Sequence, residues 1–238
     1  MKIYCIISCL FWTIFCYSQM HDKVELHSTD KAKVVIICTA ALIESNYQMR
    51  KQEYVFSISL LKDYGYEPYV FEACKSSPPS FFENYTKNVF YSNVNDYRLI
   101  NKGVNEARSL IEGFKHYSFD DETMIIKLTG RYWLNSPIFI NVVESHPEVD
   151  AFVRFKEDFP IPNGYVFTGC FAMKHKHFKA MLDQLDFVRM EEKLIDIEIE
   201  AAHYIRKMEE RGCTIMKLEN VDMTANIGSA FPPIYSKW

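Results

Sequence analysis

The chain has 238 residues, of which 48% are hydrophobic and 24% charged, and its formal net charge is −4. This length and composition suffice for the core of one sizeable domain and exclude a disordered chain. The near balance of charge, with no basic run longer than the KHKH of residues 174–177, excludes nucleic acid as a partner.

The first twenty residues have the pattern of a targeting segment. Lys2 precedes an uncharged run over residues 3–20, which predicts a signal peptide or a signal-anchor at residues 1–20. Polar side chains make the run marginal as a permanent membrane span, which needs about 20 apolar residues. We therefore expect a protein of the secretory pathway or one tethered to a membrane. A cytoplasmic protein that starts at Met20 is the alternative.

Strands and helices alternate along the first half of the remaining chain. Strands are predicted at residues 34–40, 67–73, 87–92 and 123–128, and helices at 46–61 and 101–117, the second capped by Asn101. Crossovers of this length suit parallel strands. We therefore expect an α/β fold over residues 31–238, with a mostly parallel central sheet and helices on both faces.

The second half mixes its elements less regularly. Strands are predicted at residues 151–155, 166–173 and 214–218, and helices at 137–146, 177–185 and 192–211, the last closed by Gly212. The tail after residue 218 is expected to be irregular.

The cysteines and histidines give no metal-binding signature. Cys38, Cys74, Cys170 and Cys213 are widely spaced and form no Cys-x-x-Cys pair. Cys38 and Cys170 are predicted to be buried thiols. If the chain is exported, a disulfide bond is the alternative. His175 and His177 would share one face of a strand, but no third ligand is evident, so both are expected at the surface. No metal site is predicted.

Charged and polar residues end several of the predicted parallel strands. Thr39 ends the first strand and Glu72 the second, and the stretch MIIKLTGRYWL brings Lys127, Thr129 and Arg131 to the end of the fourth. In an open parallel sheet, ligands bind beyond these carboxyl ends. Two cations beside a turn rich in exposed N–H groups suit a phosphate or diphosphate. A solvated loop in which Arg131 pairs with a neighbouring acid is the alternative.

The order of these pieces resembles the donor half of GT-A-type glycosyltransferases. Asn101, Gly103 and Ala107 match an Asn-x-Gly-x-x-x-Ala element that opens the helix before the metal-binding strand of that family. Residues 164–173 resemble its acceptor-side strand, and residues 195–204 resemble the acidic helix that carries the catalytic base of inverting members. The resemblance covers roughly residues 33–218 and rests on the order and spacing of short motifs.

The sequence departs from that family at one position. The family's Asp-x-Asp motif, which holds a divalent cation (Mn or Mg) on the donor diphosphate, should lie near residues 127–129, where this chain has Lys-Leu-Thr. Asp120 and Asp121 precede the strand and are expected at its opposite end. Either Lys127 and Arg131 replace the metal, which we favour, or donor binding has been lost. The sequence therefore leaves both alternatives for the cofactor, a divalent cation or none.

The resemblance implies a glycosyltransferase that moves a sugar from a nucleotide-sugar donor to an unknown acceptor hydroxyl on a glycan, lipid or protein. The residues expected to bind the donor are Thr39, Glu72, Asn101, Lys127, Thr129 and Arg131. Glu198 is the expected catalytic base and Asp196 the second choice, because an acid in an apolar segment loses hydration and its pKa rises.

Two other functions compete with sugar transfer. One is a non-catalytic carbohydrate- or protein-binding member of the same fold. The other is a nucleotidyl- or methyltransferase, which would need a glycine-rich loop after the first strand, and the stretch CTAALIES contains no glycine.

Overall fold

The computed structural model describes residues 31–41, 47–73, 81–92, 94, 96, 98–156, 164–226 and 235–237. The chain divides into two compact units, Met1–Asp30 and Lys31–Trp238, and every described residue belongs to the second. The targeting segment predicted at residues 1–20 and Cys74 lie outside the described residues. Among the described helices, none combines the length and apolar character needed to cross a membrane.

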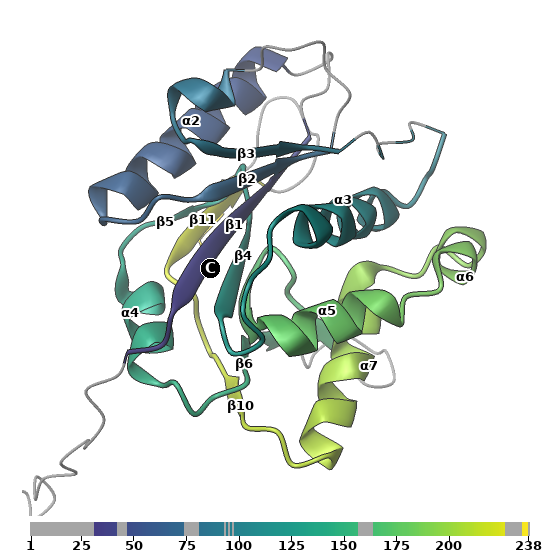
Figure 1. Ribbon diagram of the computed structural model, residues 1–238. Coiled ribbons are helices and arrows are strands. Elements are labelled where there is room, and N and C mark those ends of the chain that lie inside the picture. The colour runs from purple at the N-terminus through teal and green to yellow at the C-terminus, as the bar shows by residue number, and fades with distance from the viewer. Residues whose placement is uncertain are drawn as a thin grey trace, which may run out of the picture. The chain divides into compact units, whose positions relative to one another are not determined.

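A central sheet organises the described part of the chain (Figure 1). Its seven strands lie in the order β10-β6-β9-β4-β1-β2-β3. Only β9 is antiparallel to its neighbours, β4 and β6, so the predicted mostly parallel sheet is confirmed. The bounds are β1 Val34–Ala40, β2 Tyr69–Glu72, β3 Asn88–Tyr91, β4 Met124–Thr129, β6 Ala151–Val153, β9 Cys170–Lys174 and β10 Ile215–Lys217.

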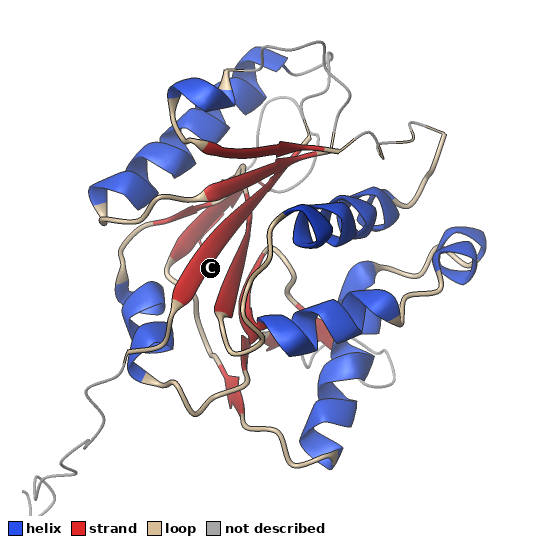
Figure 2. Cartoon of the chain, in the orientation of Figure 1, coloured by secondary structure: helices blue, strands red, loops and turns tan. Residues whose placement is uncertain are grey.

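Helices cover both faces of this sheet, as predicted (Figure 2). One face packs against α2 (Tyr47–Asp63) and α4 (Ile138–Ser145). The other face packs against α3 (Lys102–His116), α5 (His175–Asp183), α6 (Phe187–Glu192) and α7 (Ile197–Glu210). A short 3-10 helix, η2, spans Phe82–Asn84 and precedes β3.

Alternation along the inner strands fills both layers of the core. In β4, Ile126 faces the layer of α2 and α4, and Ile125 faces the layer of α3, α5 and α7. Cys38 and Cys170 are free, buried thiols, and burial raises the pKa of each to about 12. The prediction of two buried thiols is therefore confirmed. Cys213 is also free.

Smaller sheets flank the central one. Strand β11 (Met223–Asn226) pairs with β5 (Trp133–Leu134) and with β12 (Tyr235–Lys237), and β7 (Phe155–Lys156) pairs with β8 (Tyr165–Val166). The expectation of an irregular tail was therefore wrong over β11 and β12. The pairing of β11 with β5 joins residues about ninety positions apart, which local sequence patterns do not reveal.

Two predicted strands are each divided in the structure, the one at residues 151–155 into β6 and β7 and the one at residues 166–173 into β8 and β9. The single strand expected at residues 166–173 is split into β8 and β9 by a turn, in which the carbonyl of Gly169 accepts from the Thr129 N–H at 2.8 Å. The helix expected at residues 192–211 begins only at Ile197, as α7, and a separate helix that was not predicted, α6, precedes it. Between them Leu194 adopts a left-handed φ of 51°, and the Ile195 N–H closes the end of α6 on Met190 O.

Candidate active site at the carboxyl edge of the sheet

A cleft of about 1240 Å³ opens beyond the carboxyl ends of β1 and β4. Its walls come from the first turns of α2, α3 and α7 and from the segment around β8. Six of the eight predicted site residues line it: Thr39, Asn101, Thr129, Arg131, Asp196 and Glu198. The cleft therefore lies at the edge of the sheet where ligand sites of open parallel sheets are expected.

Lys127 does not line this cleft. Its side chain is buried, and its Nζ lies 2.8 Å from Glu106 Oε1 in an ion pair. The ammonium also donates to the Thr168 carbonyl at 2.7 Å and to Thr129 Oγ1 at 3.1 Å. The expectation that Lys127 presents its charge to a ligand was therefore wrong in this geometry, because three internal acceptors surround the ammonium.

Glu72 lies away from the cleft, and Asn101 lines it with a side chain that bonds within the protein. Glu72 is completely buried and is not among the residues that line the cleft. The Asn101 side chain accepts from the Gly103 N–H, which confirms its role as the cap of α3. Its amide nitrogen donates to Met190 O at 3.1 Å and to Ile195 O at 2.7 Å, so Asn101 fastens α3 to the junction of α6 and α7.

The turn after β4 is more closely bonded than its sequence suggested. The Thr129 N–H donates to Gly169 O, the Gly130 N–H to Thr39 O and the Tyr132 N–H to Thr129 O, at 2.7–2.8 Å. The expectation of a turn rich in exposed N–H groups was therefore wrong for these three residues. A Cβ at Gly130 would lie 2.9 Å from the Tyr54 ring and 3.0 Å from Thr39 O, so the turn packs directly against its neighbours.

Glu106 joins β1 to β4 at the floor of the cleft. Its Oε1 accepts from Thr39 Oγ1 at 2.6 Å in addition to the ion pair with Lys127. Burial alone would raise the pKa of Glu106, but the charge and hydrogen bond of Lys127 and the bond from Thr39 outweigh burial and lower it. Glu106 was not among the residues predicted for the site. Its signal was the spacing from Gly103, which puts both residues on one face of α3.

Glu198 lies in the first turn of α7 with its carboxylate in the cleft. Its Oε1 accepts from Thr168 Oγ1 at 2.7 Å. Burial raises the pKa of Glu198, the charge of Glu106 raises it further, and the Thr168 hydrogen bond opposes this rise. Asp196 is exposed and occupies the N-cap position of α7, where its side chain makes no capping bond.

Thr168 was also not among the predicted site residues. It links Glu198 to Glu106 through Lys127. Its carbonyl accepts from Lys127 and its hydroxyl donates to Glu198. It lies in the turn between β8 and β9, which the sequence pattern treated as the interior of a strand. The four side chains of Glu106, Lys127, Thr168 and Glu198 are called the cleft network below.

The end of β4 does not fit a divalent cation. The position that the Asp-x-Asp motif would occupy carries the buried ammonium of Lys127, which repels a second cation and already holds Glu106. Asp120 precedes β4 and lies at the opposite end of this strand, as predicted. Its carboxylate pairs with Lys33 at 2.7 Å.

Comparisons with known proteins give distant matches only. No family model matches the chain, and no curated protein matches it. One solved structure with a similar fold is described as a glycosyltransferase involved in the glycosylation of the major capsid of PBCV-1. It is 10% identical, the alignment covers 77% of this chain and 81% of that chain, and the TM-score is 0.47. A likeness this distant carries no conclusion about the chemistry of this chain.

Proposed function

We propose that this chain is a glycosyltransferase of the GT-A type that transfers a sugar from a nucleotide-sugar to an acceptor hydroxyl. The observation that carries the proposal is that Glu198 and Arg131 line the same cleft at the carboxyl edge of the sheet. A poorly hydrated carboxylate suits a general base, and a guanidinium suits a diphosphate. The Asn101, Gly103 and Ala107 element supports the same assignment.

The proposed reaction gives Glu198 and Arg131 one role each. Glu198 accepts the proton of the acceptor hydroxyl while the hydroxyl oxygen forms the new bond to the anomeric carbon of the donor sugar. The bond from that carbon to the diphosphate breaks, and the diphosphate leaves with the electron pair. Arg131 neutralises the charge that develops on this leaving group, and no metal ion is assigned a role.

The remaining predicted donor residues fall into two groups. Thr39, Asn101 and Thr129 line the cleft and are proposed to contact the nucleoside or the phosphates. Lys127 and Glu72 are proposed to act indirectly: Lys127 holds Glu106 as a carboxylate, and Glu72 supports β2 from within the core.

The proposed setting follows from the donor. Sugar nucleotides occur in the cytosol and in the Golgi lumen of eukaryotes, so residues 1–20, if they anchor the protein, would place the domain in a Golgi-type compartment. The proposed acceptor is a hydroxyl of a glycan, a lipid or a protein.

The test replaces Glu198 with glutamine and measures binding and turnover separately. Glu198→Gln should bind UDP- and GDP-sugars in calorimetry as the unmodified protein does, because the amide keeps the shape of the side chain. Transfer to water or simple alkyl glycosides should fall by about 10²–10⁴-fold. The matched control is Glu200→Gln, because Glu200 lies on the same turn of α7 but pairs with Arg189 outside the cleft.

A non-catalytic binding protein is the second candidate, and the engagement of Lys127 by Glu106 favours it. If Arg131→Ala abolishes sugar-nucleotide binding while the unmodified protein shows no turnover with or without manganese, the binding function replaces the catalytic one. If the unmodified protein binds no sugar nucleotide at all, both candidates fail. Arg206→Ala serves as the control, because Arg206 pairs with Glu209 and does not line the cleft.

A further inference from the structure

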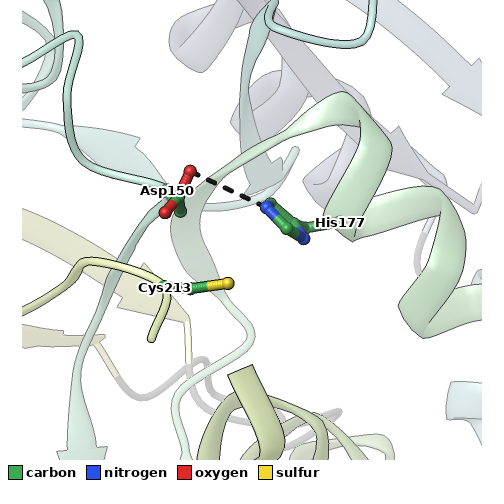
Figure 3. Close-up of side chains that lie close together, drawn as sticks. All are labelled: Asp150, His177 and Cys213. Carbon is green, nitrogen blue, oxygen red and sulfur yellow. Dashed lines mark ion pairs between the residues drawn. The ribbon is translucent and has the colours of Figure 1, made fainter. Parts of the chain in front are cut away.

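Three side chains with metal-binding atoms converge at the amino edge of the sheet, opposite the cleft. They are Asp150, His177 and Cys213, and their ligand atoms all lie within 4.8 Å of one another. All three are half-buried, and Asp150 Oδ1 lies 3.7 Å from His177 Nε2 (Figure 3). The sequence reading considered His177 but found no third ligand, because Asp150 and Cys213 are distant from it along the chain.

The backbone holds each of these residues in place by a different device. Gly212 ends α7 with a φ of 82°, and the Cys213 N–H bonds to Met208 O at 3.0 Å, which fixes where the thiol starts. The Asp150 N–H donates to Thr214 O at 2.8 Å, and the Thr214 N–H donates to Asp150 Oδ2 at 2.9 Å. His177 lies in the first turn of α5.

We propose that Asp150, His177 and Cys213 bind a zinc ion. A thiolate, an imidazole and a carboxylate are the ligand types that zinc takes in proteins, and three of them leave a fourth tetrahedral position for water. Metal–ligand distances of about 2.0–2.3 Å require ligand atoms about 3.5 Å apart. Rotation of the half-buried His177 and Cys213 side chains shortens the separations of up to 4.8 Å between the ligand atoms to the distance that zinc requires. The Cys213 thiol releases its proton to solvent as the sulfur–zinc bond forms.

Lys174 is the competitor for this site. Its Nζ lies 3.1 Å from Asp150 Oδ1, which is the oxygen that a metal would take. The same ammonium lies 3.1 Å from Glu122 Oε2, so Lys174 keeps an ionic partner when Asp150 turns to the metal. The exchange therefore leaves no buried charge without a partner.

A cysteine nucleophile activated by His177 is a weaker explanation of the same cluster. Such a reaction needs a cavity that brings a substrate to the sulfur. None of the three residues lines the cleft, which opens at the carboxyl edge of the sheet. By contrast, a metal ion needs only the three ligands and a water molecule, and it would link the starts of β6, α5 and β10.

The experiment measures zinc and cobalt binding to the full-length protein after chelator treatment. The unmodified protein should take up one zinc ion, rise in melting temperature with zinc, and show a sulfur-to-cobalt charge-transfer band when loaded with Co²⁺. Cys213→Ser and His177→Ala should each weaken zinc binding by at least about tenfold and remove the thermal shift, and Cys213→Ser should also abolish the band. His203→Ala, which removes an exposed histidine of α7, should behave as the unmodified protein.

The proposal is overturned if the unmodified protein takes up no zinc, or if Cys213→Ser and His177→Ala bind zinc as tightly as it does. His177→Ala provides the answer if Cys213→Ser does not fold, and circular dichroism identifies that case. Sugar-nucleotide affinity should stay unchanged in both variants, because the zinc ligands lie at the opposite edge from the cleft.

Discussion

At the scale of single residues, the cleft network explains why neighbouring carboxylates behave differently. Glu106 receives an ammonium and a hydroxyl, and its pKa falls below the ordinary value despite burial. At Glu198 burial dominates and the pKa rises, because the hydrogen bond from Thr168 and the weaker attraction of Lys127 do not offset it. Two acids in one site with pKa values pushed apart is the arrangement expected where one acid stays charged and the other exchanges a proton.

Thr168→Val tests this balance. The Thr168 hydroxyl lowers the pKa of Glu198, and valine keeps the shape of the buried side chain but removes the bond. The pKa of Glu198 should therefore rise further. Because only the charged form acts as a base, the acid limb of the kcat/KM profile should move to higher pH. An unmoved acid limb in the folded variant would mean that Glu198 does not set the profile.

At the scale of elements, the sequence located most helices and strands but missed the turn before β9 and the true start of α7. The run from Val166 to Met173 is apolar except at Thr168 and Gly169, and it was interpreted as one strand, so the turn that places Thr168 in the cleft was not predicted. The turn is fixed by the Gly169 carbonyl, which bonds to the distant Thr129 N–H. A local pattern cannot report a contact of this kind.

The break between α6 and α7 escaped the sequence reading for another reason. Left-handed helix ends are usually marked by glycine or asparagine, and here leucine occupies the position. Leu194 at φ 51° carries no such signal. The break nevertheless determines the site, because it starts α7 at Ile197 and so directs Glu198 into the cleft.

The packing of α3 on the sheet gives a prediction about its two glycines. A Cβ at Gly113 would lie 2.1 Å from the buried Phe71 ring, whereas a Cβ at Gly103 would meet Ile197 at 3.1 Å. Both substitutions to alanine gain about 1 kcal/mol of helix propensity. Gly113→Ala should still lower the free energy of unfolding by about 1–3 kcal/mol in urea titrations, because the core cannot make room.

Gly103→Ala is the matched control for this prediction. It gains the same propensity against a much smaller steric conflict, so its loss of stability should be clearly less than that of Gly113→Ala. Equal stabilities of the two variants would contradict the close approach of α3 to β2.

At the scale of the whole molecule, the cleft depends on both helical layers. Arg50 and Tyr54 reach it from α2 on one face, while Glu106 and Glu198 reach it from α3 and α7 on the other. Arg50 and Tyr54 bond to Ala41, which follows β1, and Glu106 bonds to Thr39 of β1 and Lys127 of β4. Glu198 is linked to Lys127 through Thr168. The geometry of the site therefore requires that the two layers and the sheet fold as one unit.

A pair of neighbouring substitutions in β4 tests this unity. Ile125 and Ile126 are both fully buried but face opposite layers, and each change to valine should cost about 0.5–1.5 kcal/mol of unfolding free energy. With Trp12 and Trp238 replaced by phenylalanine, the fluorescence of Trp133 reports on the layer of α2, where its ring meets Phe56. Ile125→Val should shift the fluorescence midpoint in urea and the circular dichroism midpoint equally, although it lies on the far face. A shift confined to circular dichroism would mean that the two layers unfold separately.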